Sequence, residues 1–223
     1  MFTSVKVIGR GRVGSAVAAR LGERDVEARG ETPDVVLLCV PDRAIGDVAA
    51  GVAPGPWIAH TSGATPLAAL DPHVRRFSLH PLQTFTRERG AEQLDGAYAA
   101  VSGESVEARN TGFALARLLG LEPFALDDAD RVLYHAGAVF ASNYLVTLQR
   151  AAAELFEAAS APPAALEPLM RRTIDNGFAL TGPIERGDVQ TVDAHARAIR
   201  ARRPQLEPLY ATLARATQQL ALV

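Results

Sequence analysis

Short apolar runs alternate with helical patterns over the first half of the chain. Four of these runs are continuous, are bounded by turn residues and have the length of buried strands: SVKVIG, DVVLLCV, PWIAHTS and GAYAAVS. Segments with helical spacing, including RVGSAVAARLGE and DRAIGDVAAGVA, lie between them. Strands that alternate with helices predict βαβ units, and continuous apolar strands indicate a sheet covered on both faces. We therefore expect a doubly wound parallel α/β sheet over residues 1–126.

The pattern becomes helical after about Leu126. It predicts four helices, over about 128–159, from Pro162 or Pro163 to Leu180, over about 188–201 and from Pro204 to the end of the chain. A proline near the first turn or an aspartate cap begins three of them. We therefore expect an all-α domain over residues 127–223. Its long first helix would either brace both domains or pack on another subunit.

The composition is that of an ordinary soluble globular protein, with 48% apolar residues, 22% charged residues and a formal net charge of -2. This balance shows no bias toward nucleic acid or membrane surfaces. No apolar run approaches the roughly 20 residues of a membrane span, and the first residues do not form a signal peptide. Cys39, the only cysteine, lies in an apolar run, which suits a reducing compartment. We expect a cytoplasmic protein.

Three glycines, Gly9, Gly11 and Gly14, form a G-x-G-x-x-G pattern between the first predicted strand and the first predicted helix. In such a loop the first glycine allows a tight turn, the second lets the backbone approach a pyrophosphate, and the third allows close helix packing. The helix N-terminus then faces the anion. A tight turn alone would also explain the glycines, but the flanking strand and helix favour dinucleotide binding. The loop would consist of Gly9, Arg10, Gly11, Arg12, Val13 and Gly14.

The choice between NADP and NAD depends on the residue about 20 positions beyond the first glycine of the loop. An arginine there suits the 2′-phosphate of NADP, and an acidic residue suits the 2′-hydroxyl of NAD. Arg29 falls at this place, flanked by Glu27 and Glu31, and Arg10 and Arg12 add to the positive field. We favour NADP, with NAD possible. A merely solvated Arg29 explains the sequence equally well in this arginine-rich chain.

Two loops after later strands would complete the cofactor site, because ligands of such sheets bind beyond the carboxyl ends of the strands. Val40 ends one strand, and Pro41 with Asp42 would turn the chain over the cofactor. A cap for the next helix explains Asp42 equally well. Ser62 follows the next strand and offers a hydroxyl donor to a nicotinamide amide or a substrate carboxylate. A plain turn at the start of a helix explains Ser62 equally well.

His80 lies in the segment HPLQTF, which we interpret as a polar loop between apolar anchors. The proline that follows forces the histidine into extended geometry and so fixes its direction. A loop histidine beside amide and hydroxyl groups is a candidate substrate contact or proton carrier. A purely structural histidine that satisfies a turn is the alternative.

The long helix near the domain boundary carries the second group of candidates. At 100° per residue, Arg131, His135 and Ser142 lie within about 40° of a common line, with Asn143 about 80° to one side. Gly137, inside this helix, indicates close approach by a ligand or by another backbone. The face would present these polar groups to the crevice. A helix–helix contact with buried polar ties explains the same pattern equally well.

The segment LTGPIERGD joins two of the predicted helices. Asp188 is well placed as an N-cap, which explains that residue fully. Thr181 and Arg186 are not explained by capping and would be free to reach an acidic substrate or a partner subunit.

Several of these segments together resemble Rossmann-like proteins that carry an uncharacterised helical C-terminal domain. The segments are VIGRGRVG, VPDRAI, HTSGA, HPLQTF, YHAGAVFASNYLVTL and LTGPIERGD. The resemblance implies kinship with pyrroline-5-carboxylate reductase, ketopantoate reductase and 3-hydroxyacid dehydrogenases. It implies an N-terminal NAD(P)-binding Rossmann domain with Gly9, Gly11 and Gly14 as the cofactor loop, a helical substrate domain, and a homodimer formed through the C-terminal helices.

The chain departs from these relatives at the catalytic centre. Hydroxyacid dehydrogenases of the group place a lysine four residues before an asparagine, but Val139 stands four residues before Asn143, and Lys6 is the only lysine. We therefore predict that His135 or His80 is the general acid, with Ser142, Asn143 and Ser62 as orienting groups. No metal site is expected.

The function expected from the sequence is that of an NADP-dependent oxidoreductase acting on a small carbonyl or imine metabolite. The alternative is a non-catalytic NADP-binding or sensing protein that dimerises through its helices. A weaker resemblance links HPLQTF to the histidine-proline segment of prephenate dehydrogenases.

Overall fold

The computed structural model describes residues 2–28 and 32–222, and the contacts within it divide the chain into two compact units. The first unit spans Met1–Ala141 and the second Ser142–Val223. The division lies beyond the boundary expected at Leu126, and hydrogen bonds of Arg131 with Ser78 and Ser102 tie the start of the next helix to the sheet of the first unit. Each unit is described here by itself.

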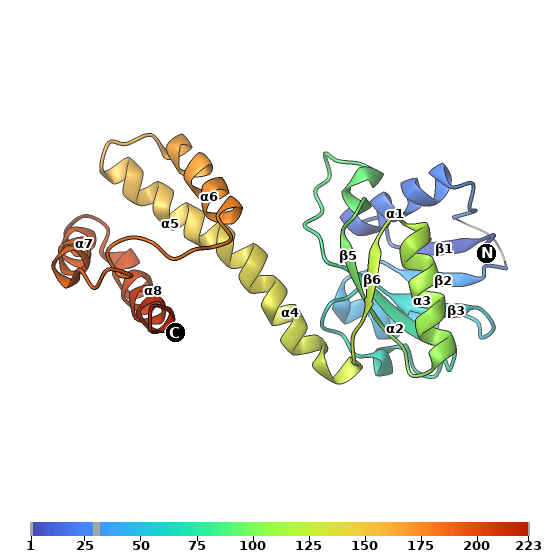
Figure 1. Ribbon diagram of the computed structural model, residues 1–223. Coiled ribbons are helices and arrows are strands. Elements are labelled where there is room, and N and C mark those ends of the chain that lie inside the picture. The colour runs from blue at the N-terminus through green and yellow to red at the C-terminus, as the bar shows by residue number, and fades with distance from the viewer. Residues whose placement is uncertain (1, 29–31, 223) are drawn as a thin grey trace. The chain divides into compact units, whose positions relative to one another are not determined.

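The first unit is built on a six-stranded sheet in which the strands follow their order in the sequence (Figure 1). The strands are β1 (Val5–Ile8), β2 (Val35–Leu38), β3 (Trp57–His60), β4 (Arg76–Pro81), β5 (Tyr98–Ser102) and β6 (Glu122–Ala125). The first four are parallel, whereas β5 runs antiparallel to β4 and β6 is parallel to β5. The sheet is therefore mixed and not wholly parallel as expected. The chain returns from β4 through a loop with one short 3-10 turn, η3 (Ala91–Leu94), instead of a crossover helix, which reverses β5.

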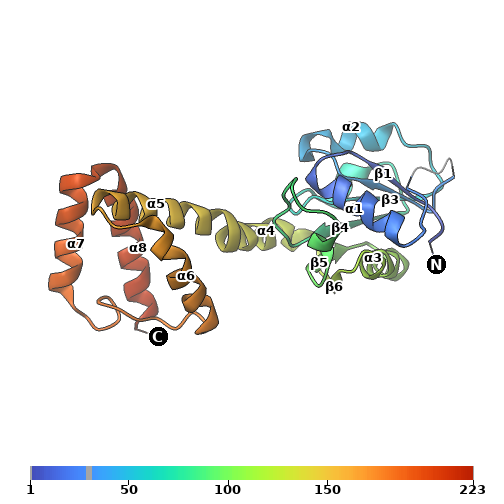
Figure 2. The same ribbon diagram turned by 90° about the horizontal axis from the view of Figure 1, so that it is seen from above.

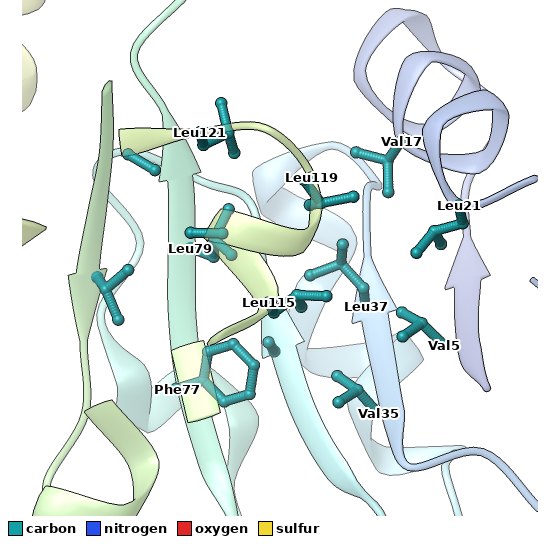
Figure 3. Packing of buried hydrophobic residues seen from close by; sticks show 14 of the residues in the cluster. Val5, Val17, Leu21, Val35, Leu37, Phe77, Leu79, Leu115, Leu119 and Leu121 are labelled. Carbon is teal, nitrogen blue, oxygen red and sulfur yellow. The ribbon is translucent and has the colours of Figure 1, made fainter. Parts of the chain in front are cut away.

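Helices cover both faces of this sheet, as the continuous apolar strands predict (Figures 1 and 2). The helices α1 (Arg12–Glu23) and α3 (Val106–Leu118) lie on one face, and α2 (Ile45–Ala50) lies on the other. Figure 3 shows the larger core, where side chains of α1 and α3 meet those of the strands, including Val17, Leu21, Leu115, Leu37 and Phe77. In β2 the side chains of Val35 and Leu37 enter this core, while those of Val36 and Leu38 enter the smaller core on the α2 face. This unit is a doubly wound, Rossmann-type α/β domain.

Among the described residues that follow α1, Glu27 forms a β-bridge with Ser4. The position assigned to the ribose contact, Arg29, lies outside the described residues. Its predicted role therefore stays a prediction from the sequence.

The second unit is helical throughout, as predicted. It contains α5 (Leu145–Ala158), α6 (Leu166–Asp175), α7 (Val189–Arg202) and α8 (Glu207–Leu220), with α5 against α6 and α7 against α8 (Figure 2). Prolines lead into α6 and α8 through the 3-10 turns η6 (Pro163–Ala165) and η7 (Pro204–Leu206). Asp188 caps α7 as expected, with its side chain accepting from the Thr191 N–H at 3.0 Å. The second predicted helix ends at Asp175 instead of Leu180, because Gly177 and Phe178 have left-handed φ angles of 66° and 60°.

The long helix predicted from Asp128 is present, but a π-helical segment interrupts it. A 3-10 turn, η4 (Asp128–Asp130), leads into α4 (Arg131–Val139), and the π-helical segment Phe140–Tyr144 joins α4 to α5. A π turn inserts an extra residue, so the spacing of 100° per residue does not hold beyond Val139. The common line through Arg131, His135 and Ser142 assumes a regular helix, so the placement of Ser142 on it stays a prediction.

Candidate functional site

The glycine loop has the backbone geometry that its sequence predicts. Gly9, directly after β1, has a φ of +109°, and a side chain there would lie 2.3 Å from the carbonyl oxygen of Cys39. A side chain at Gly14, in the first turn of α1, would lie 2.2 Å from the carbonyl oxygen of Gly9. Both positions therefore require glycine, the first for its conformation and the second for close packing of helix on strand.

Gly11 differs from the other two glycines because its surroundings are open. It is the N-cap of α1, no side chain caps this helix, and no acidic residue lies in its first turn. A Cβ at Gly11 would have no described atom within 4 Å. The N–H groups of the first turn thus face a space that a pyrophosphate would fill, so the loop fits the cofactor that the sequence implies.

The remaining predicted cofactor residues lie around this loop. Arg10 and Arg12 are exposed, and Arg12 Nη1 donates to the carbonyl oxygen of Phe85 at 3.4 Å, whereas Val13 is half-buried against the core. A side chain at Gly9 would meet Val40 Cγ1 at 3.3 Å, so the loops after β1 and β2 adjoin each other. Pro41 precedes the short 3-10 turn η1 (Asp42–Ala44). The structure thus brings the loop of β2 to the glycine loop, as expected.

The side chain of Ser62 is engaged by its own loop and by the loop after β2. Its hydroxyl donates to Asp42 Oδ2 at 2.8 Å, lies 2.8 Å from the Thr65 hydroxyl, and accepts the Thr65 N–H at 3.0 Å. The side chain is buried. Of the two interpretations of Ser62, the geometry therefore favours a structural turn over a donor to the ligand.

His80 lies in strand β4 and not in a loop, which corrects the sequence-based expectation. Its Nδ1 lies 2.9 Å from the hydroxyl of Tyr134 on α4. The pKa of His80 is lowered from 6.5 to about 4, first by burial and then by the neighbouring His135 and Arg131. The imidazole of His80 is therefore neutral near pH 7, and its imidazolium form is not available as a general acid there.

Gly63 lies where the side chains of His80 and His135 meet. A Cβ at Gly63 would lie 2.4 Å from His135 Cδ2 and 3.0 Å from His80 Nε2. The two imidazole rings are 5.8 Å apart and nearly perpendicular. The end of β3, strand β4 and helix α4 thus bring the two predicted histidines together around a glycine that allows no side chain.

Arg131 anchors the first turn of α4 to the sheet, and only 1% of its surface is exposed. Its guanidinium donates to the hydroxyls of Ser78 and Ser102 and to the carbonyl oxygen of Ser62. Its Nε lies 3.8 Å from Asp128 Oδ1 and has no hydrogen-bond partner among the described residues. Arg131 is therefore a buried structural cation, and the prediction that it presents a polar group to the crevice is wrong.

His60 and Tyr134 are two further residues of this cluster that the sequence analysis did not single out. His60, at the end of β3, is fully buried, and its ring nitrogens have no hydrogen-bond partner among the described residues. Burial, with the charge of Arg131, lowers its pKa from 6.5 to about 3. Tyr134 directly precedes His135 on α4, so the tyrosine could have been found as the helical neighbour of a candidate histidine.

The other two predicted catalytic residues, Ser142 and Asn143, belong to the second unit. They lie in the π-helical segment, where the Ser142 hydroxyl donates to Asn143 Oδ1 at 2.9 Å. π-Helical turns occur frequently at functional sites. The predicted role of Gly137 in a close approach has no counterpart within the described chain, since a Cβ there would have no neighbour within 4 Å.

One hollow of the first unit lies away from the glycine loop. It opens where β2 and β3 begin, beside Asp34, Trp57 and Arg75. Ligands of doubly wound sheets bind at the opposite edge, beyond the carboxyl ends of the strands. We therefore assign the cofactor site to the glycine loop. The described residues contain no cluster of histidine, cysteine or carboxylate groups that would hold a metal, and none of their helices is long and apolar enough to span a membrane.

Comparison with solved structures supports the fold of the chain. A Bacteroides fragilis protein assigned as a candidate NADP oxidoreductase has a TM-score of 0.81 at 21% identity, over 97% of this chain and 98% of its own. A Thermotoga maritima protein has a TM-score of 0.79 at 22% identity, over 97% of this chain and 98% of its own. An imine reductase from Aspergillus terreus in complex with NADPH4 has a TM-score of 0.68 at 14% identity, over 97% and 94%.

The sequence comparisons give the family. No curated protein matches the chain. Residues 97–217, more than half of the chain, match the family described as Domain of unknown function (DUF2520). This region begins before β5 and includes α4 with Arg131, Tyr134 and His135. The chain therefore belongs to the DUF2520 family and carries a Rossmann-type domain before its helical region.

Proposed function

We propose that this protein is an NADP-dependent oxidoreductase that acts on a small carbonyl or imine metabolite. The observation that carries the proposal is the pairing of an open anion cradle at Gly11 with a histidine pair around Gly63. The cradle and the pair follow β1, β3 and β4 at the edge of the sheet where doubly wound folds bind ligands. The names of the similar structures, among them an NADP oxidoreductase and a reductase bound to NADPH4, support the proposal.

The cofactor would be held by the first turn of α1 and by the loops after β1 and β2. The open N–H groups after Gly11 would hold the pyrophosphate, and Val40 and Pro41 would flank it. The exposed guanidinium groups of Arg10 and Arg12 favour the additional phosphate of NADP over NAD. When bound, the reduced nicotinamide supplies the hydride that reduces a C=O or C=N carbon.

The residues of the chain would bind and orient the substrate and deliver the proton. We assign these tasks to His80 and His135 because the two side chains meet around Gly63, and Ser142 and Asn143 remain predicted orienting groups. Removal of a proton carrier typically lowers a rate by about 10²- to 10⁴-fold. If His80→Ala and His135→Ala both keep full turnover of an identified substrate, this assignment of roles is wrong.

The test is a screen of carbonyl and imine metabolites for NADPH consumption, which is measured as the loss of NADPH absorbance. We expect consumption with at least one member, and weaker binding of NADPH by Gly11→Ala. For the NADP preference, Arg29→Ala should lower the ratio of NADP affinity to NAD affinity, and an unchanged ratio would exclude this role of Arg29. Tight NADPH binding without any consumption would instead support the second candidate, a non-catalytic NADP-binding sensor.

We also propose that the protein is a cytoplasmic homodimer formed through the second unit. The support is the number of exposed apolar side chains on its helices and their connections: Leu145, Val146, Leu148, Leu169, Ile174, Phe178, Val189, Leu213 and Leu220. A second copy of the chain that covered these side chains would remove their apolar surface from water.

A further inference from the structure

The hydrogen bond between Tyr134 and His80 selects one tautomer of the imidazole. The Tyr134 oxygen lies 2.9 Å from His80 Nδ1. A phenol is a stronger acid than a neutral imidazole N–H, and an imidazole nitrogen is a stronger base than a phenol oxygen, so the phenol donates and Nδ1 accepts. A neutral imidazole carries one proton, which then resides on Nε2. His80 therefore presents an N–H donor from Nε2, the atom that faces Gly63.

The charged and titratable groups around His80 favour this uncharged form. His135, Arg131 and Tyr134 face it from α4, Asp42 faces it from η1, and His60 lies beside it on β3. The cation of Arg131 and the neighbouring His135 disfavour a second positive charge on His80, and at this place they outweigh the carboxylate of Asp42. The carboxylate of Asp42 also accepts the hydroxyl of Ser62, which disperses its charge.

From this arrangement we propose that His80 is an uncharged hydrogen-bond donor, held by Tyr134 and by the buried Arg131, and that the substrate is a neutral carbonyl compound and not a protonated imine. The inference rests on the proposed function and narrows its substrate class. Reduction of a carbonyl group develops negative charge on its oxygen, which an N–H donor in a positive field stabilises. A protonated imine brings a positive charge into the same field, so its binding is disfavoured.

The proton balance of carbonyl reduction can be completed by the same residues. As the carbonyl carbon gains a hydride from the cofactor, the π electrons of the C=O bond move onto oxygen. The oxygen takes the proton of His80 Nε2, and His80 Nδ1 takes the proton of the Tyr134 hydroxyl. Burial raises the pKa of Tyr134 to about 12 and the cation of Arg131 offsets this only in part, so the Tyr134 phenolate then takes its proton back from His80 Nδ1. As it does so, His80 Nε2 takes a proton from solvent, and His80 returns to its starting tautomer.

The state of His80 can be tested without turnover, by ¹⁵N NMR of the histidine side chains in the full chain. We expect a neutral ring with the proton on Nε2 at pH 7. In Tyr134→Phe we expect a mixture of the two tautomers and at least tenfold lower kcat on any ketone that is turned over. The matched control is Tyr210→Phe, because the Tyr210 hydroxyl lies 3.0 Å from Nδ1 of His195 in a similar pair on α7 and α8. A proton on Nδ1, or a doubly protonated ring at pH 7, overturns the inference.

The substrate class can be tested with a ketone and an imine of equal ring size, cyclopentanone and 1-pyrroline. We expect at least tenfold higher kcat/KM of NADPH consumption with the ketone. A preference for 1-pyrroline overturns the inference but confirms the proposed function. If NADPH is consumed neither with these two compounds nor with any other member of the panel, the result contradicts the proposed function instead.

A binding measurement then decides the inference without turnover. Cyclopentanol and pyrrolidinium, the two reduction products, are titrated into protein saturated with NADP⁺ while the His80 resonance is followed. We expect cyclopentanol to bind at least tenfold more tightly. Tighter binding of pyrrolidinium, or no shift with either compound, overturns the inference.

Discussion

The guanidinium of Arg131 donates to the hydroxyl of Ser78, so the first turn of α4 is fixed to strand β4. Ser78 pairs with Ser102 in the neighbouring antiparallel strand, and both hydroxyls lie on the same face of the sheet and reach the same Nη1. The same face carries His80, two residues beyond Ser78. One buried cation thus sets the position of Tyr134 and His135 relative to His80.

Replacement of Arg131 by methionine should destabilise the protein strongly. The methionine would fill much of the space but would leave two serine hydroxyls and the Ser62 carbonyl buried without their donor. Each buried group without a partner costs about 1 to 3 kcal/mol, so we expect a loss of roughly 3 kcal/mol or more in the free energy of unfolding. Urea denaturation measures this loss.

The matched control for this prediction is Arg171→Met on α6. Arg171 pairs with Glu167 at 2.8 Å, but both side chains are more than two thirds exposed. Exposed pairs contribute about 0 to 1 kcal/mol, so this variant should unfold nearly like the parent. Equal effects of the two substitutions would show that Arg131 has no anchoring role.

Substitutions of glycine by alanine in and near the loop should separate folding from cofactor binding. Gly14→Ala should lower the melting temperature, because its Cβ would lie 2.2 Å from the Gly9 carbonyl oxygen. Gly11→Ala should keep the melting temperature of the apoprotein, because its Cβ meets no described atom, yet weaken NADPH binding at least tenfold by occupying the place of the pyrophosphate. Thermal melts and NADPH fluorescence titrations measure the two effects.

Gly22→Ala, near the end of α1, serves as the control for the loop variants. No described atom lies within 4 Å of its Cβ, and alanine favours a helix over glycine by about 0.5 to 1 kcal/mol. This variant should melt higher and bind NADPH unchanged. Unchanged binding in Gly11→Ala would exclude the loop as the phosphate site.

The buried imidazole of His60 should make the protein sensitive to acid. Its pKa is lowered from 6.5 to about 3, so below about pH 6.5 the unfolded chain takes up a proton that the folded chain refuses until about pH 3. Stability is therefore lost as the pH falls through this window, by about 1.4 kcal/mol per pH unit for this one group. His60→Leu should remove this share of the pH dependence and keep or raise the stability at pH 7, because no hydrogen bond of the ring is lost.

His73→Leu is the control for the His60 variant. His73 is also buried, but its Nε2 lies 2.9 Å from the carbonyl oxygen of Ala49. Its removal should therefore destabilise the protein at pH 7 by roughly 1 to 3 kcal/mol. Urea denaturation between pH 7 and pH 5 measures the free energy of unfolding of both variants. An equal loss in His60→Leu and His73→Leu at pH 7 would contradict the prediction that the His60 ring makes no stabilising hydrogen bond.

The glycine loop could be predicted from the sequence, because each glycine answers a requirement of the backbone that is local in the chain. The buried cluster of Arg131 with Ser78 and Ser102 could not be predicted from the sequence. Whether Arg131 is solvated or buried depends on the pairing of Ser78 with Ser102, and this pairing follows from the reversal of β5. The alternation of the segment RFSLHP indicates a strand, with Ser78 and His80 on one face, but its histidine-proline pair favoured a loop.

The π-helical segment illustrates a second limit of prediction from sequence. The residues FASNY have no proline or glycine that would signal a break, and regular helix geometry was the natural assumption. One inserted residue shifts the phase of the helix for the residues that follow it. Phase errors of this kind grow along a helix, so they affect Arg131 and His135, one turn apart, less than Ser142 and Asn143, whose placement stays a prediction.

Association through the second unit should depend on the apolar side chains of α6. Leu169 and Ile174 are 60% and 51% exposed, and their contact with water is unfavourable unless another surface covers them. We expect sedimentation equilibrium to show a dimer for the parent chain and a monomer for the double variant Leu169→Arg/Ile174→Arg, with helical content kept in circular dichroism. Val74→Arg is the control, because Val74 is 89% exposed but belongs to the first unit, so its replacement should leave the dimer intact. A parent chain that sediments as a monomer at all concentrations would contradict the homodimer, and a double variant that stays dimeric would place the interface away from α6.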